Sequence, residues 1–298
     1  MRLVENTLII IGGPTASGKT SLAIEVAKYF NTEIVSADSR QLFREMNIGT
    51  AKPSQQQLAE VKHHFINSHS IHDEMNTGIY ETQCISLLEN LFKKNKTIVM
   101  VGGTGLYINA VVNGIDNLPE ANTEIRNQLQ QQLKLNGIEP LQNKLKEIDI
   151  STYLKIDLQN PNRLMRALEV FMITGKPYSS FLKNKKTERN FDVKMFGIER
   201  SRERLYEVIN KRVDDMIQNG LLKEAEQLYP FKNLNALQTV GYMELFDVIE
   251  NKMTLEVAVE KIKQHTRNYA KRQVTWFKKA ESIKWVTEVA EIISEINN

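Results

Sequence analysis

The sequence has few of the residues that build cross-linked or membrane-embedded proteins. It contains one cysteine, Cys84, among 298 residues, which excludes an internal disulfide and any cysteine-based zinc ribbon. No apolar run approaches the length needed to cross a bilayer, and no cationic-then-apolar leader precedes the first expected strand. We therefore expect a globular, cytoplasmic protein that has no membrane partner.

The sequence also has no clear excess of positive or negative charge. Lys and Arg number 39 against 36 Asp and Glu, and the resulting formal net charge of +3 is too small to indicate a polyanionic partner by itself. Hydrophobic residues make up 41% of the chain, which is enough for a proper core in one large domain or two ordinary ones. Nothing in the sequence indicates a repeat or a dimer seam, so we expect a monomer.

The side chains that could carry thiol or metal chemistry are poorly placed for it. Cys84 lies in a helical pattern with Ile85 and Leu88, which indicates a buried thiol rather than a nucleophile. Four histidines fall in a segment that has neither helical nor strand periodicity and lacks a ligand framework, so we do not expect a structural metal there. These histidines are His63, His64, His69 and His72, and the sequence leaves their role open.

The strongest motif is a glycine-rich stretch between an apolar run, residues 8–11, and an amphipathic run, residues 21–30. The stretch consists of Gly13, Pro14, Thr15, Ala16, Ser17, Gly18, Lys19 and Thr20. It fits the G-x-x-x-x-G-K-[ST] phosphate loop, in which backbone N–H groups, the lysine and a helix N-terminus attract phosphate oxygens. Thr20 would offer its hydroxyl to Mg²⁺. The sequence therefore predicts an oligophosphate site with magnesium.

The first part of the chain alternates strand and helix signals, which indicates an α/β fold with a parallel sheet covered on both faces. Expected strands at residues 8–11, 33–36 and 97–101 are each followed by a functional-looking loop. Ligands of such sheets bind beyond the carboxyl ends of the strands, so we expect these loops to converge on one edge. The predicted fold is a P-loop NTPase-like parallel sheet core.

Strand signals stop after about residue 118, where capped helical patterns begin, and they return in residues 191–198. We therefore expect a helical insertion domain at residues 118–188, with a polar linker at 183–190, inside a core made of residues 1–117 and 189–298. The rest of the core is expected to be mostly helical, with one more short strand at residues 283–286.

Two further features beside the phosphate loop could take part in chemistry. Asp38 follows the second strand, where a carboxylate could accept a proton or hold magnesium through water, although it could also only form a turn. The strand at 97–101 ends in Gly102, Gly103, Thr104 and Gly105, where many phosphate-loop NTPases carry a metal-binding aspartate. The missing acid weakens an ATPase interpretation.

Basic residues cluster near the end of the chain, without an acidic residue between Lys261 and Lys279. The cluster consists of Lys261, Lys263, Arg267, Lys271, Arg272, Lys278 and Lys279, with Tyr269, Trp276 and Phe277 among them. A cationic helix with aromatic residues suits a nucleic acid, but a solvated face with its aromatics in the core fits as well. Arg163 and Arg166, one turn apart in the insertion, could reach one ligand together.

Two alternatives follow from these residues. A small-molecule or nucleotide kinase would use the same loop for ATP and would explain Lys19 and Asp38, but it leaves the basic helix and the insertion unexplained. A nucleic-acid-binding module with a relic phosphate loop would bind RNA and catalyse nothing.

Taken together and in order, seven motifs resemble the signatures of the tRNA dimethylallyltransferase family, bacterial type. They are residues 13–20 (GPTASGKT), 38–41 (DSRQ), 49–53 (GTAKP), 102–107 (GGTGLY), 162–169 (NRLMRALE), 239–242 (TVGY) and 266–273 (TRNYAKRQ). The resemblance runs over nearly the whole chain. It departs from the family pattern at Phe43, often tyrosine, at Gln159 and Asn160, usually Asn-Asp, and at Val208, often arginine.

The resemblance implies transfer of a dimethylallyl group from dimethylallyl diphosphate to N6 of the adenosine 3′-adjacent to the anticodon (adenosine-37), in tRNAs that read codons starting with U. Residues 13–20 would bind the diphosphate with Mg²⁺, and Asp38, Thr104 and Arg212 would be catalytic. Contacts with the tRNA anticodon stem-loop would come from Asp38, Ser39, Arg40, Gln41, Thr104, Arg126, Asn162, Arg163, Leu164, Met165, Arg166, Gln238, Gly241 and Tyr242. The insertion would act as a tRNA clamp.

Overall fold

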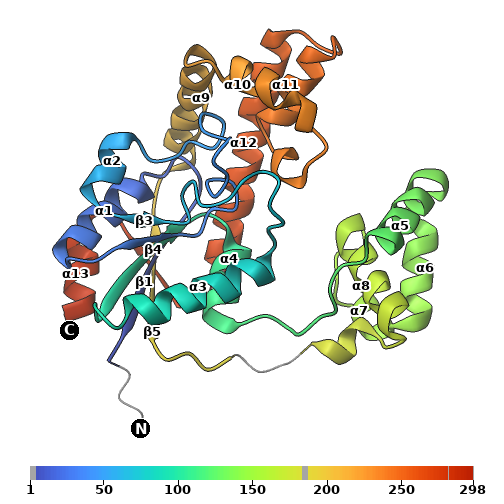
Figure 1. Ribbon diagram of the computed structural model, residues 1–298, viewed down its shortest axis with the longest axis horizontal. Helices are drawn as coiled ribbons and strands as arrows, with labels where there is room; N and C mark the ends of the chain where they lie inside the picture. Colours follow the sequence, from blue (N-terminus) through green and yellow to red (C-terminus); the bar gives the residue numbers. More distant parts are fainter. Residues whose placement is uncertain (1–4, 183–186, 281, 298) are drawn as a thin grey trace. The chain divides into compact units, whose positions relative to one another are not determined.

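The chain folds into two compact units in the computed structural model (Figure 1). The larger unit consists of residues 1–112 and 189–298, and the smaller unit of residues 113–188. The structure describes residues 5–182, 187–280 and 282–297.

The smaller unit begins at Asn113 rather than at residue 118, where we expected the boundary. The backbone N–H of Thr187 donates to the carbonyl of Asn113 at 2.9 Å, and this bond ties the two ends of the unit together. The expected linker lies partly outside the described residues, because these do not include 183–186.

A parallel sheet forms the centre of the larger unit, and its order within the described residues is β3-β2-β4-β1-β5-β6. The strands are β1 (Thr7–Gly12), β2 (Ile34–Ser36), β3 (His63–His64), β4 (Thr97–Gly102), β5 (Asp192–Ile198) and β6 (Ile283–Val286). The predicted α/β fold with a parallel sheet is confirmed. The edge strand β3 was missed, because two residues are too short to show a period-2 pattern.

The three central strands end at the same level. Gly12 of β1 pairs with Gly102 of β4 on one side and with Gly197 of β5 on the other. The loops that follow these strands therefore leave the sheet side by side, as expected for the carboxyl edge of a parallel sheet.

Helices cover both faces of the sheet. The helices of the larger unit are α1 (Lys19–Tyr29), α2 (Gln55–Glu60), α3 (Thr77–Leu91), α4 (Gly105–Asn113), α9 (Arg202–Gln218), α10 (Leu221–Leu228), α11 (Tyr242–Ile249), α12 (Leu255–Lys278) and α13 (Val289–Asn297), with 3₁₀ turns η2 (Tyr229–Phe231) and η3 (Asn235–Leu237). Leu8 and Ile10 of β1 pack with residues of α3 and α4, whereas Ile9 and Ile11 pack with residues of α1 and α13. The alternation along β1 thus builds a core on each face.

Helices α9, α10 and α11 gather around the first half of α12, at the end of the larger unit away from both chain termini (Figure 1). Helix α12 then runs down to the sheet, where Phe277 joins the core that contains Leu8. This long helix therefore links the helical end of the unit to the carboxyl edge of the sheet.

The smaller unit is helical and has a leucine-rich core of its own. Its elements are α5 (Thr123–Asn136), α6 (Glu139–Ile148), α7 (Ile150–Tyr153), α8 (Pro161–Thr174) and the 3₁₀ turn η1 (Tyr178–Phe181). The expected capped helices are present: Asn122 accepts from the N–H of Ile125 at the start of α5, and Asn160 accepts from the N–H of Arg163 at the start of α8. Leu129, Leu145 and Leu168 are fully buried between the helices.

Cys84 is fully buried in α3, as its apolar neighbours predicted. Burial raises the pKa of its thiol to about 12, so the reactive thiolate is not available at neutral pH. No helix of the described residues is both long and apolar enough to span a bilayer.

Candidate active site

The phosphate loop, residues 13–20, joins the end of β1 to the start of α1. Gly18 caps the helix with φ +90°, a left-handed backbone that glycine adopts without strain. The first N–H groups of α1 have no partner inside the helix and carry the positive end of its dipole. The hydroxyl of Ser17 is buried in the loop without a hydrogen-bond partner among the described residues. These unsatisfied donors suit a bound anion.

Three cationic side chains surround the phosphate loop. Lys19 donates from Nζ to the carbonyl of Pro14 at 2.8 Å, and Arg212 of α9 donates to the hydroxyl of Thr15 at 3.4 Å. Arg200, directly after β5, donates from Nε to the carbonyl of Ser17 at 3.4 Å. Arg212 was expected here, whereas Arg200 was missed, although its place just past a central strand was a usable signal.

Lys19 has an unusual protonation equilibrium. Burial lowers the pKa of its ammonium group to about 8, with the positive charge of Arg212 adding to the shift and the negative charge of Asp38 opposing it. Lys19 is therefore still mainly protonated at neutral pH, and it lies close enough to Asp38 for the two charges to interact. An anion bound in the loop would favour the charged form of Lys19 further.

Asp38 shapes the next loop. Its Oδ1 accepts hydrogen bonds from the N–H groups of Arg40 at 2.9 Å and Gln41 at 3.2 Å, so the turn-forming role weighed for this residue is present. Among the described residues no hydrogen bond reaches its Oδ2. Asp38 therefore combines a fixed position with one carboxylate oxygen that is available to a ligand.

Thr104 closes the site on the side of β4. Its N–H donates to the carbonyl of Ala37, and its hydroxyl oxygen accepts from the N–H of Ser39 at 3.0 Å. A Cβ at Gly102 would lie 2.2 Å from the carbonyl oxygen of Ala37, so only glycine permits this approach. The GGTG stretch therefore holds the Asp38 loop at the carboxyl end of β4.

Tyr269 of α12, which the sequence indicated only as an aromatic residue of the basic cluster, lies at this site. Burial and the charge of Asp38 raise the pKa of its phenol to about 12, and its hydrogen bond with Thr104 opposes this shift. The guanidinium of Arg272 lies 5.9 Å from the centre of its ring. With 37% of its surface exposed, the ring offers a neutral aromatic face beside Asp38.

Several residues expected to contact tRNA are instead engaged within the larger unit. Arg40 donates to the carbonyls of Asn235 and Gln238, at 3.0 and 3.4 Å. Tyr242 is fully buried and donates its hydroxyl to Glu224 at 2.6 Å. The ring of Tyr242 has no surface for RNA in this position, so the structure gives it a packing role.

The remaining members of this group also have internal hydrogen bonds. Gln41 donates from Nε2 to the carbonyls of Thr50 and Ala51, and Gln238 donates to the carbonyl of Lys232. The N–H of Gly241 is bound by Glu244 at 2.7 Å, and the hydroxyl of Ser39 accepts from that of Thr104 at 3.4 Å.

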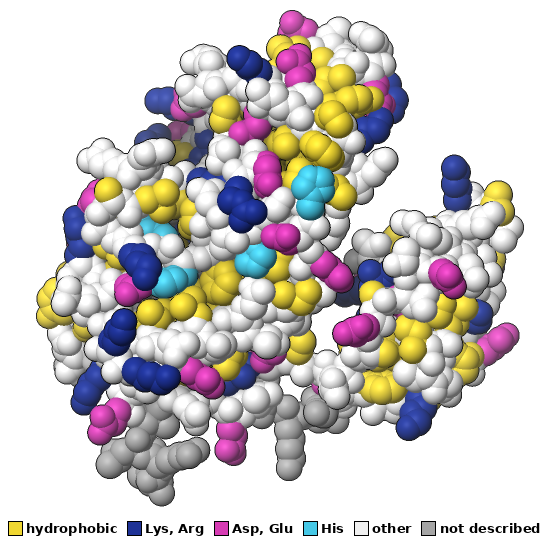
Figure 2. Space-filling view, viewed as in Figure 1, with side chains coloured by type: hydrophobic (Ala, Val, Ile, Leu, Met, Phe, Trp, Pro, Cys, Tyr) yellow, Lys and Arg dark blue, Asp and Glu magenta, His cyan; other side chains and the backbone are white. Residues whose placement is uncertain are grey.

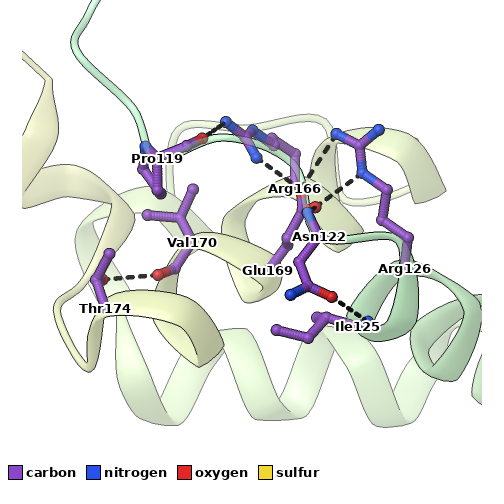
Figure 3. A network of polar contacts seen from close by, with 8 residues as sticks. All are labelled: Pro119, Asn122, Ile125, Arg126, Arg166, Glu169, Val170 and Thr174. Carbon is purple, nitrogen blue, oxygen red and sulfur yellow. Dashed lines mark hydrogen bonds and ion pairs between the residues drawn. The ribbon is translucent and has the colours of Figure 1, made fainter.

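In the smaller unit, one buried carboxylate organises two of the expected arginines (Figure 3). Glu169 accepts from Arg126 Nε at 2.8 Å, from Arg166 Nη1 at 2.6 Å and from the N–H of Asn122 at 2.8 Å. Burial favours the protonated carboxyl, but these hydrogen bonds outweigh it and lower the pKa of Glu169. The Arg126 side chain remains 52% exposed, so it can still offer charge to a ligand.

The other expected tRNA contacts of α8 differ in exposure. Asn162 and Arg163 are exposed and lie outside this network, and Met165 is half-buried. Leu164 is fully buried in the leucine core and has no surface for RNA. Leu164 and Leu168 are spaced by one helical turn, a pattern that indicated core packing.

The basic helix α12 has both a solvated cationic face and side chains that are used inside the unit. Lys263 forms ion pairs with Asp214 and Glu260, and Arg267 donates to Asn210, so these two cations are partly used inside the unit. Phe277 is fully buried, as the core interpretation expected. The other cations, Lys261, Lys271, Arg272, Lys278 and Lys279, are exposed.

The donors for magnesium are few. Thr20 is half-buried at the start of α1, and the described residues contain no group of three His, Cys, Asp or Glu side chains that could hold a metal. Histidine side chains are spread over the face of the larger unit in Figure 2, and His64, for example, is paired with Glu33. One protein hydroxyl suits Mg²⁺ when the other ligands are substrate phosphates and water.

Comparison with known proteins agrees with this geometry. The family model for IPP transferases matches residues 41–280. The tRNA dimethylallyltransferase of Christiangramia forsetii is 54% identical over 95% of this chain and 93% of its own. The chain belongs to the IPP transferase family.

Solved IPP transferase structures extend this comparison to the whole fold. The tRNA delta(2)-isopentenylpyrophosphate transferase of Staphylococcus epidermidis is 35% identical, with a TM-score of 0.70, over 98% of this chain and 99% of its own. A eukaryotic dimethylallyltransferase acting on tRNA is 28% identical, with a TM-score of 0.79, over 96% of this chain and 75% of its own. The family model begins after Asp38, but these matches cover nearly the whole chain.

We predict that the pyrophosphate affinity of the wild type falls relative to that of Lys19→Arg as the pH rises through about 8. Lysine loses its charge in this range, whereas a guanidinium stays protonated. Calorimetric titration of both proteins at a series of pH values measures the ratio of the wild-type affinity to the Lys19→Arg affinity. The arginine variant corrects for the titration of pyrophosphate itself. A ratio that does not change with pH contradicts the proximity of a titrating Lys19 to the anion.

Glu169→Gln should lower the free energy of unfolding by about 1 to 3 kcal/mol at neutral pH, because it weakens the hydrogen bonds of a buried acceptor. The folded-state pKa of Glu169 is lowered, so its contribution is present above the unfolded pKa of about 4.3 and is lost as the pH falls. Denaturant unfolding should therefore show a smaller difference from wild type in acid. The control is Glu124→Gln, because Glu124 is exposed. Equal losses of unfolding free energy in the two variants would contradict a stabilising role of the Glu169 hydrogen bonds.

Proposed function

We propose that the protein transfers a dimethylallyl group from dimethylallyl diphosphate to N6 of adenosine-37 of tRNAs that read codons starting with U, releasing diphosphate. The observation that carries this proposal is a cationic phosphate loop beside an available carboxylate oxygen of Asp38. It is supported by membership of the IPP transferase family and by relatives that are named tRNA dimethylallyltransferases.

The phosphate loop would stabilise the leaving group. When the allylic C–O bond breaks, negative charge accumulates on the diphosphate, and Lys19, Arg212 and the N–H groups of α1, which all lie at the phosphate loop, would stabilise it. Mg²⁺, held by Thr20 together with phosphate oxygens, would neutralise part of that charge. Ser17 would gain a partner for its buried hydroxyl from the same anion.

Asp38 would serve the nucleophile. The exocyclic N6 attacks the first carbon of the dimethylallyl group, the C–O bond to diphosphate breaks, and the surplus proton leaves N6 for Asp38 Oδ2. The hydrogen bonds at Oδ1 hold the carboxylate in place during this transfer. Thr104 fixes the same loop through the N–H of Ser39 and so acts next to the reacting amine.

The target adenosine lies inside a base stack and must be extruded before it reaches such a site. Bases of an anticodon loop are already unpaired, so the extrusion costs only a few kcal/mol. Exposed cations of α12, such as Lys271 and Arg272, and Arg163 of the smaller unit would bind the phosphate backbone. The smaller unit would then act as the clamp on the anticodon stem-loop.

The function is tested by mass analysis of nucleosides from unmodified tRNA after incubation with the protein, Mg²⁺ and dimethylallyl diphosphate. We expect N6-dimethylallyladenosine in the fragment that contains the anticodon loop, together with an equal amount of released diphosphate. A parallel incubation with ATP should transfer no phosphate. Phosphate transfer without prenylation would contradict the proposal.

We predict that Asp38→Asn lowers kcat by roughly 10² to 10⁴ while tRNA and diphosphate still bind, because the amide keeps the turn but cannot accept the proton. Single-turnover rates and tRNA binding measure the two effects separately. Asp73→Asn is the matched control, since Asp73 is exposed and also accepts a backbone N–H, that of Ser70 at 2.7 Å. A nearly unchanged rate for Asp38→Asn would remove Asp38 from the proton transfer.

A further inference from the structure

Gln273 of α12 connects the two glycine-rich loops of the site directly. Its Oε1 accepts a hydrogen bond from the N–H of Thr15 in the phosphate loop at 2.8 Å. Its Nε2 donates to the carbonyl of Gly103 at 2.9 Å. Gln273 is only 7% exposed; its hydrogen bond to Gly103 is buried and the one from Thr15 is partly buried.

This amide lies on the side of α12 that packs into the core. Ala270 and Phe277, one turn before and one turn after Gln273, are fully buried, and the glutamine therefore interrupts an apolar stripe. A polar residue at such a position is destabilising unless both of its polar atoms have partners. Here both have partners, and both partners belong to the site loops.

The glycines of these loops leave room for α12. A Cβ at Gly103 would lie 2.1 Å from Nε2 of Gln273, and a Cβ at Gly12 would lie 2.2 Å from the ring of Phe277. A Cβ at Gly105 would lie 2.3 Å from the ring of Trp276. The glycine-rich end of β4, which lacks the metal-binding aspartate of many phosphate-loop NTPases, is thus shaped to receive this helix, and Gln273 supplies the polar contact there.

We propose that Gln273 is a positioning residue that fixes the phosphate loop in its diphosphate-binding conformation by bridging Thr15 and Gly103. The inference rests on the proposed function for the identity of the diphosphate substrate. Helix α12 would then have two tasks. Its exposed cations would bind RNA, and its buried side would position the site, where Tyr269 lies beside Asp38 and Gln273 contacts the phosphate loop.

The bridge needs a neutral side chain of this length with one acceptor and one donor. Methionine has a similar volume and keeps the packing against Gly103, but it forms neither hydrogen bond. An ionised glutamate accepts from Thr15, but it cannot donate to Gly103 and it adds a negative charge near the diphosphate. The two substitutions therefore separate the hydrogen bonds of Gln273 from its packing.

The test compares wild type, Gln273→Met and Gln273→Glu in calorimetric binding of inorganic pyrophosphate with Mg²⁺ and in steady-state kinetics. We expect Gln273→Met to weaken pyrophosphate binding and to raise the KM for dimethylallyl diphosphate by roughly 10- to 100-fold, from two lost hydrogen bonds. Gln273→Glu should bind pyrophosphate no more tightly than Gln273→Met does. The KM for tRNA should stay unchanged in both. The matched control is Gln264→Met, an exposed glutamine of the same helix.

Unchanged pyrophosphate binding in Gln273→Met would overturn the inference. An equal loss of tRNA and pyrophosphate affinity would overturn it too, because general damage to α12 would then explain the effect. Melting temperatures identify a variant that fails to fold, and Gln273→Glu then supplies the comparison. A wild-type protein that binds pyrophosphate but modifies no tRNA would refute the proposed function. The role of Gln273 would then be judged from the pyrophosphate affinities of the variants alone.

Discussion

The site depends on one constraint, which is that three parallel strands end at the same level. Gly12, Gly102 and Gly197 are paired across β4, β1 and β5, so the loops after these strands leave the sheet together. Parallel strands direct their carboxyl ends to one edge, and the helix after the first strand points its N-terminus there. Asp38 reaches the same edge because it follows β2, whose last residue pairs with Val101 of β4. Positive potential, a carboxylate and a hydroxyl are therefore collected at one place by the topology of the sheet.

Buried carboxylates then fix segments within each of the two units. Glu224 of α10 accepts from three consecutive N–H groups, those of Asn47, Ile48 and Gly49, and from the hydroxyl of Tyr242. It thereby ties the stretch that follows Asp38 to the helical end of the larger unit. Glu169 has the corresponding task in the smaller unit, where it orients two arginines. A buried charge is costly unless it is paired, and each of these carboxylates is bound by several donors.

Much of this arrangement followed from local sequence patterns. Apolar runs predicted the central strands, and capped helical patterns predicted the helices of the smaller unit. The phosphate-loop motif predicted the strand, loop and helix around Lys19. The convergence of Asp38, Thr104 and Arg212 on that loop followed from the parallel sheet and the resemblance to a family. Their chemical roles remain predictions.

Other features depend on tertiary packing, which a motif does not encode. Tyr242 and Leu164 belong to motifs expected to bind RNA, yet both side chains are in the core. Arg40 belongs to another, but it binds carbonyl groups that lie almost two hundred residues further along the chain. Gln273 ends the motif at residues 266–273, but nothing in that motif indicated that its side chain would join two loops of the site. Family motifs indicated which segments form the site, and burial decided which side chains face it.

The central claim is that the phosphate loop holds a departing diphosphate while Asp38 faces the attacking amine. It is tested most directly by a crystal structure of the protein with an anticodon stem-loop, Mg²⁺ and a thio-analogue of dimethylallyl diphosphate that cannot ionise. We expect the diphosphate oxygens to contact Lys19 and the hydroxyl of Ser17, and N6 of the extruded adenine to lie within hydrogen-bond distance of Asp38 Oδ2. A diphosphate bound outside the phosphate loop, or an adenine whose N6 points away from Asp38, would contradict the account.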